Sequence, residues 1–122
     1  MDNTEVVNNT SKYIVKTTGI GSETNQELVD AEKLAEGTDG SKVSLIECYY
    51  LIEGTGTLTI NAASETETQA AGKTVAKPLS LTGKGKYGLR PEQLKFGNDK
   101  IFKLTTDANV KSYLLVTEFR RN

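Results

Sequence analysis

Apolar residues recur at every second position over several short segments of the chain, a pattern typical of β-strands with one buried face. In residues 57–61, for example, Leu58 and Ile60 alternate with polar residues. The alternation predicts strands over residues 12–21, 42–54, 57–61, 78–83, 100–107 and 110–122, with a short edge strand near residues 74–76. Because turns rich in Gly, Asn and Asp separate these segments, we predict an all-β fold, an antiparallel β-sandwich or jelly-roll-like single domain.

Residues 42–54 have the strongest strand pattern, with apolar residues on both faces. Such a strand is predicted to be central in its sheet and at least partly covered on both sides. The sequence Glu-Gly-Thr-Gly at residues 53–56 then predicts a β-hairpin that leads into residues 57–61. Residues 23–41 fit two alternatives, a short helix or a strand followed by a helical turn. Loops are predicted over residues 62–77 and 91–99.

The beginning of the chain lacks any such pattern. Residues 1–11 are polar and rich in Asn and Thr, so we predict a flexible N-terminal arm before a β-sandwich domain over residues 12–122. No basic segment precedes an apolar one here, and a signal peptide is not expected. No apolar run approaches the ~20 residues that a membrane helix needs. We therefore expect a protein that is made in the cytoplasm and does not bind a membrane.

Composition limits the ligand classes. The net charge is −1, whereas nucleic-acid binding calls for a clear basic excess, so no nucleic-acid partner is expected. Residues 1–61 carry a net charge of −6 and residues 62–122 a net charge of +5. These opposite charges could cancel within the fold, attract subunits head to tail, or simply be solvated on the strands. The apolar fraction of 36% suits a thin sandwich, or a domain that completes its burial against a partner.

Side chains suited to catalysis are scarce. The chain has no histidine, which removes Ser–His and Cys–His catalysis and histidine metal sites. Its single cysteine, Cys48, lies in an apolar strand, where we expect a buried, unreactive thiol. Glu65 and Glu67 could share one face of a strand and bind a hard cation, but calcium sites need six or more oxygens, and a solvated acidic loop is the simpler interpretation. We predict no catalytic residue, no cofactor and no metal site.

Residues 83–88 contain glycines spaced as G-x-G-x-x-G. A dinucleotide site needs this motif between a strand and a helix, yet Arg90 and a proline follow at once and no helical period comes after. The glycines are therefore predicted to provide positive φ angles or close strand packing. On this interpretation Lys84, Lys86 and Arg90 lie on an exposed basic loop.

Three segments resemble small structural proteins of tailed bacteriophage particles. They are TSKYIVKTTGIGSETNQELVDAEKLAEG (residues 10–37), SKVSLIECYYLIEGTGTLTI (41–60) and KLTTDANVKSYLLVTEFRRN (103–122). The resemblance implies a non-catalytic virion protein with a β-sandwich or jelly-roll fold, most simply a head decoration (cement) protein on the capsid surface. It further implies a homo-oligomer, with a trimer favoured, and the major capsid protein or other virion proteins as partners.

Two surfaces are expected to contribute to these contacts. They are the N-terminal arm, through Asn3, Val6, Val7 and Asn9, and the basic loop, through Lys84, Lys86 and Arg90. Two alternatives stay open at this stage. One is a tail, neck or fibre module that recognises a host-surface glycan. The other is an enzyme whose carboxylates are distant in sequence and converge in the fold.

Overall fold

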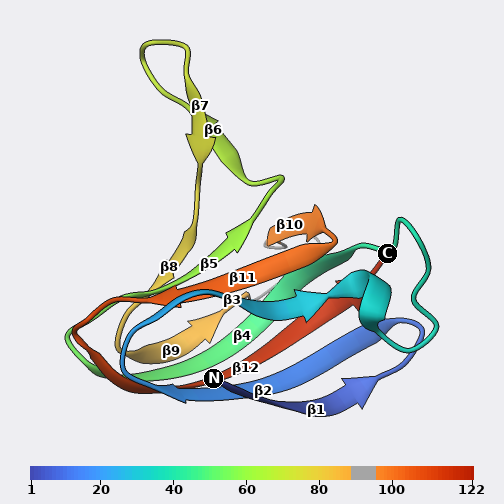
Figure 1. Ribbon diagram of the computed structural model, residues 1–122, viewed down its shortest axis with the longest axis horizontal. Coiled ribbons are helices and arrows are strands. Elements are labelled where there is room, and N and C mark those ends of the chain that lie inside the picture. Colours follow the sequence, from blue (N-terminus) through green and yellow to red (C-terminus); the bar gives the residue numbers. More distant parts are fainter. Residues whose placement is uncertain (89–95) are drawn as a thin grey trace.

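The computed structural model describes residues 1–88 and 96–122. Within these ranges nearly all regular structure is β, and no α-helix occurs (Figure 1). The strands are β1 (Asp2–Asn8), β2 (Lys12–Ile20), β3 (Glu23–Asp30), β4 (Val43–Gly54), β5 (Leu58–Ala62), β6 (Thr66–Thr68), β7 (Thr74–Ala76), β8 (Leu79–Leu81), β9 (Lys84–Tyr87), β10 (Phe96–Asp99), β11 (Ile101–Thr106) and β12 (Val110–Arg121). The all-β prediction is therefore confirmed.

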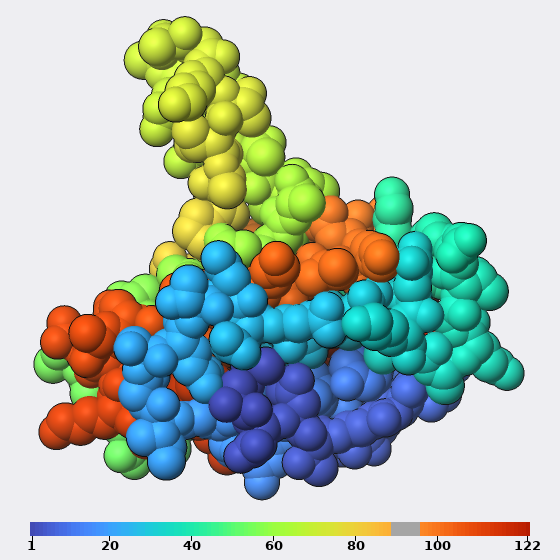
Figure 2. Space-filling model, in the orientation of Figure 1, coloured from blue at the N-terminus to red at the C-terminus, as the bar shows by residue number. Residues whose placement is uncertain are grey.

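The strands form two main antiparallel sheets and a separate ribbon. The large sheet has the order β1-β2-β12-β4-β10, and β9 pairs with β4 on the same edge as β10. The small sheet has the order β3-β11-β5-β8. Strands β6 and β7 form a two-stranded ribbon that projects away from both sheets, as Figures 1 and 2 show.

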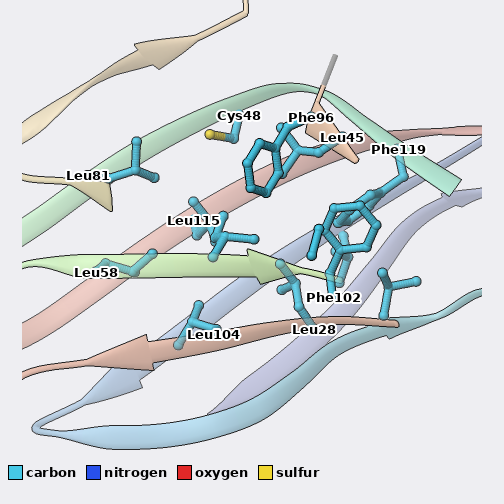
Figure 3. Close-up of a cluster of buried hydrophobic side chains, with 14 of the residues drawn as sticks. Leu28, Leu45, Cys48, Leu58, Leu81, Phe96, Phe102, Leu104, Leu115 and Phe119 are labelled. Atoms are coloured by element: carbon cyan, nitrogen blue, oxygen red, sulfur yellow. The ribbon is translucent and has the colours of Figure 1, made fainter. Parts of the chain in front are cut away.

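A single core cluster contains side chains from both sheets. Leu45 of β4 and Phe119 of β12 come from the large sheet, and Phe102 and Leu104 of β11 come from the small sheet (Figure 3). All four are fully buried, and the Phe102 and Phe119 rings meet edge to face with centroids 5.1 Å apart. Each sheet thus buries one face, as the alternation of apolar and polar residues predicts.

Strand β4 explains how a segment with two apolar faces fits this arrangement. Its pairing with β12 skips Ile46, which is an extra residue and forms a β-bulge. Before the bulge, Val43 and Leu45 belong to the core; after it, Cys48 and Ile52 do. The bulge shifts the alternation by one residue, so the core-facing side chains change from odd to even positions.

The predicted hairpin between residues 42–54 and 57–61 is wrong. Strand β4 lies in the large sheet and β5 in the small one, so the turn between them carries the chain across the core. Gly54 has a φ of 101°, and a Cβ at Gly56 would collide with Asp107 in the turn between β11 and β12. The two turns therefore pack closely at this end of the fold, which local turn chemistry alone does not reveal.

The flexible arm predicted over residues 1–11 is also wrong, because Asp2–Asn8 form strand β1 at the edge of the large sheet. Its backbone pairs with β2, and the Thr17 hydroxyl donates a hydrogen bond of 2.6 Å to the Asn3 side-chain oxygen. Five of its seven residues are exposed. An edge strand of this kind needs no apolar alternation, since pairing of its backbone holds it in place.

Other segments divide between confirmed and corrected predictions. For residues 23–41 the second alternative holds, because strand β3 is followed by a single 3-10 turn, η1 (Ala31–Lys33). The short strand near 74–76 is confirmed as β7, although its partner is β6. Residues 96–99 form β10 where a loop was predicted, and the remainder of that loop, 91–95, lies outside the described residues.

The glycines of residues 83–88 behave as predicted. Gly83 and Gly88 have φ angles of 67° and 91°, and Gly85 packs against the Tyr50 ring with no room for a Cβ atom. Lys84 and Lys86, however, lie on strand β9 and not on a loop. Since a strand occupies the middle of the motif, these glycines do not form a phosphate-binding turn ahead of a helix.

We expect Phe102→Ala to lower the free energy of unfolding by about 3–5 kcal/mol, because it leaves a cavity between the two sheets. Urea denaturation followed by circular dichroism measures this change. The matched control is Val6→Ala, since Val6 is 56% exposed and its truncation should cost less than about 0.5 kcal/mol. Equal effects of the two substitutions would contradict the proposed position of the core.

The Cys48 thiol should be unreactive in the folded protein. It is fully buried, and this burial raises its pKa to about 12. At pH 8 only about one molecule in ten thousand would then carry the thiolate, the form that attacks disulfide reagents. A chromogenic disulfide reagent should react only after unfolding, because the thiol pKa in the unfolded chain is about 8.5.

The same difference in pKa makes stability depend on pH. Because the pKa of the Cys48 thiol is higher in the folded protein, its contribution to stability is complete below about pH 8.5 and is lost as pH rises towards 12.

Candidate interaction face on the large sheet

The large sheet carries a second set of apolar side chains on the side that faces away from the core. Opposite residues of antiparallel strands point to the same side, and the pairing of β2, β12, β4 and β9 therefore identifies this set. We call this surface the outer face. Its apolar residues are Ile14, Ile20, Tyr49, Leu51, Leu114 and Val116.

Three of these side chains are open to solvent to a degree unusual for apolar groups. Ile20 is 84% exposed, Tyr49 49% and Leu51 46%, while Leu114 and Val116 between them are half-buried. None of them belongs to the core cluster. Contiguous exposed apolar groups with a polar rim are typical of surfaces that contact another molecule.

The opposite side of the molecule is different. The outward positions of β5, β8 and β11 are mainly polar, and they include Thr59, Asn61, Ser80, Lys103 and Thr105. The alternation of apolar and polar positions is therefore regular in the small sheet, whereas the central strands of the large sheet are apolar on both sides. This asymmetry marks one face of the molecule as the candidate site.

Lysines of β9 border the outer face. Lys84 pairs with Leu51, and Lys86 pairs with Tyr49. The Lys86 ammonium lies 5.1 Å from the centroid of the Tyr49 ring and 3.5 Å from a carboxylate oxygen of Glu47. The Tyr49 hydroxyl, together with the Glu47 carboxylate, raises the pKa of Lys86 above its ordinary value. This edge of the face therefore stays positively charged at neutral pH.

The seven residues predicted to make contacts do not form one surface. Val7 lies opposite Ile14 at the β1 edge of the outer face, whereas Lys84 and Lys86 lie at the β9 edge. Val6 is skipped by the pairing of β1 with β2. Arg90 lies outside the described residues.

The two predicted asparagines are engaged within the chain. Asn3 accepts the hydrogen bond from Thr17 described above. The Asn9 side-chain oxygen accepts from the backbone N–H groups of Ser11 and Lys12 at 2.9 Å each, which holds the turn between β1 and β2. Both side chains thus have a local structural role.

Sequence reasoning missed the outer face although its signal was present. Residues 42–54 have apolar side chains on both faces, and in residues 110–122 Leu114 and Val116 alternate with core positions. For residues 42–54 alone, the pattern predicts a strand covered at least in part on both sides. The structure confirms the central position of β4 and leaves its second face exposed at Tyr49 and Leu51.

Glu65, considered above as a cation ligand, anchors the β6–β7 ribbon. Its carboxylate accepts a hydrogen bond of 2.7 Å from the backbone N–H of Gly97 in β10. Beside it, the Ser64 hydroxyl donates to the Asp99 carboxylate at 2.8 Å. These contacts tie the base of the ribbon to the end of β10 and engage Glu65, one of the two carboxylates that the sequence offered as ligands.

The described residues give little support for a metal site or for a membrane-spanning helix. In residues 1–88 and 96–122, no group of three or more Cys, Asp and Glu side chains is arranged to hold a metal ion. The same residues include no helix long and apolar enough to cross a membrane. Comparisons of the chain with protein-family models, with curated proteins and with solved structures find no match. The outer face is therefore the feature from which a function is inferred.

Proposed function

We propose that this chain is a non-catalytic structural protein of a tailed bacteriophage particle, a capsid decoration protein that binds the assembled head and stabilises it. The observation that supports this best is the outer face, an apolar surface on a chain that already has a complete core. The resemblance of residues 10–37, 41–60 and 103–122 to small phage structural proteins suggests the kind of particle.

The proposal includes a β-sandwich of the jelly-roll-like kind. It is supported by the single cluster in which side chains of both sheets pack together. A sandwich has two outward faces, and a free protein in water normally keeps both of them polar. Here one of the two has an apolar centre, formed by Tyr49, Leu51, Leu114 and Val116, with charged residues around it, which is the composition expected of a surface that another protein covers.

The proposed mechanism is adhesion to several virion proteins at once. A ligand that binds the assembled shell and not its free subunits stabilises the shell by mass action. Individual contacts need only moderate strength, because linked contacts can exceed a single one by about 10²–10⁴ in affinity. The partners are the major capsid protein or other virion proteins, and a neighbouring copy of this chain is among them.

The test uses expanded heads assembled from the major capsid protein that the same genome encodes. Wild-type protein should cosediment with these heads and raise their heat resistance. The variant Tyr49→Asp/Leu51→Asp should lose at least about tenfold in occupancy, because two carboxylates on the outer face must be desolvated for contact. Both quantities are measured by sedimentation and by a thermal melt of the particles.

The matched control places two carboxylates on exposed residues of the small sheet, Ser80→Asp/Thr24→Asp. This control should bind as the wild type does, and both variants should unfold at the wild-type temperature. The proposal would be contradicted if the wild-type protein did not bind the heads, or if both variants bound them equally well. Saturable binding to glycans without binding to heads would favour a tail, neck or fibre module.

A further inference from the structure

We propose that a second copy of this chain docks on the outer face, so that two copies pack with their large sheets face to face. This inference rests on the surface that supports the proposed function and names one partner for it. An interface of this kind uses the same patch on both copies, so it closes as a dimer. It thereby replaces the trimer that the resemblance favours.

The size of the outer face is adequate for such a contact. It extends across β1, β2, β12, β4 and β9, and along β12 from Ser112 to Glu118. With strands about 4.8 Å apart and a rise of about 3.3 Å per residue, its flat footprint is roughly 400 Å². Stable pairs bury about 800 Å² per partner. The face therefore supplies about half of that area before the relief of its side chains is counted.

The charges around the face favour a copy of itself over a strongly charged partner. Both signs are present on its strands, as Asp2, Glu47, Glu53 and Glu118 and as Lys16, Lys84 and Lys86. A strongly acidic or basic partner would find like charges on part of the rim, and like charges brought together oppose binding. A mixed rim around an apolar centre can instead match its own rotated copy.

One rotation brings these groups into register. A two-fold axis in the interface, parallel to β12, places β12 of one copy over β12 of the other, so Leu114 and Val116 meet their own counterparts. The same rotation exchanges the edges of the sheet and places β9 over β1. Lys84 pairs with Leu51, and Asp2 with Thr18, and both of those residues lie level with Leu114. Lys84 of each copy therefore faces Asp2 of the other.

One further pair of groups fits this arrangement. Tyr49 of β4 lies over the part of β2 that carries Lys16, since both are level with Val116, and a lysine over a tyrosine ring is attracted to it. Glu118 lies one row further along β12, near the rim of the face. Aligned sheets pack about 10 Å apart, which leaves the two Glu118 side chains, at the open end of the patch, in contact with water.

The first experiment measures the mass of the purified protein in solution by light scattering and by sedimentation equilibrium over a wide concentration range. Wild-type protein should show a reversible monomer–dimer equilibrium. Tyr49→Asp/Leu51→Asp should weaken it at least about 100-fold, because it places two carboxylates on the patch that both copies share. The control Ser80→Asp/Thr24→Asp should dimerise as the wild type does. A wild-type protein that stays monomeric at its highest soluble concentration overturns the inference.

A charge exchange tests the orientation. Lys84→Glu and Asp2→Lys should each weaken the dimer several-fold, because each brings like charges together across the interface. The double variant Lys84→Glu/Asp2→Lys should recover most of the loss. The two residues lie on opposite edges of one sheet, about 19 Å apart at 4.8 Å per strand, so recovery cannot come from a contact within one copy. Additive losses in the double variant would overturn the arrangement.

The experiments can refute the dimer and the proposed function independently of each other. Wild-type protein that is monomeric but binds heads, with binding lost in Tyr49→Asp/Leu51→Asp, would assign the outer face to the shell and refute the dimer. A protein that dimerises but does not bind heads would agree with this inference and refute the decoration function. Vesicles or glycans that bind the face of a monomer would refute the inference as well.

Discussion

The β-bulge at Ile46 is the constraint on which both faces of the large sheet depend. Before it, odd positions of β4 face the core, and after it Cys48 and Ile52 do, so Tyr49 and Leu51 are directed outward. Without the extra residue, one half of β4 would present core side chains to solvent, since a shift of one position inverts a strand. The bulge therefore allows β4 to carry apolar residues on both sides, with one side packed in the core and Tyr49 and Leu51 on the other side exposed.

The outer face follows from this constraint and from the neighbours of β4. Strand β12 pairs with β4 along nearly its whole length and adds Leu114 and Val116, while β2 adds Ile14 and Ile20. The core residues of the sheet are already buried on the opposite side. The outward apolar groups are thus in excess of what folding requires, and their exposure in a free chain costs solubility. Contact with protein is the simplest reason to keep them.

Much of the fold was predictable from the local pattern of apolar residues. The errors of that prediction have a common cause. Alternation located β2, β5, β11 and β12, because each buries roughly every second side chain, and a long apolar run located β4. It could not show that β4 and β5 belong to different sheets, since pairing depends on partners distant in sequence. Nor could it detect β1, whose exposed residues leave no apolar period.

The candidate site was predictable in part and for a related reason. The sequence predicts contacts by Lys84 and Lys86, which do border the outer face, but it places them on a loop, whereas they lie in strand β9. The apolar residues of the face are visible in the sequence, and those of residues 42–54 are predicted to be at least partly covered. Periodicity reports the character of a strand face and not what covers it. Asn3 and Asn9 were selected as contact residues, and their hydrogen bonds hold the edge strand and its turn.

The central claim is that protein covers the outer face when this molecule functions. Hydroxyl-radical footprinting of concentrated and highly dilute protein, read by mass spectrometry, tests it directly. The account predicts that Tyr49, Leu51 and Ile20 become protected on concentration, whereas Val75 of the projecting ribbon keeps its reactivity. Unchanged oxidation of Tyr49 and Leu51, both in concentrated protein and on particles, would contradict it.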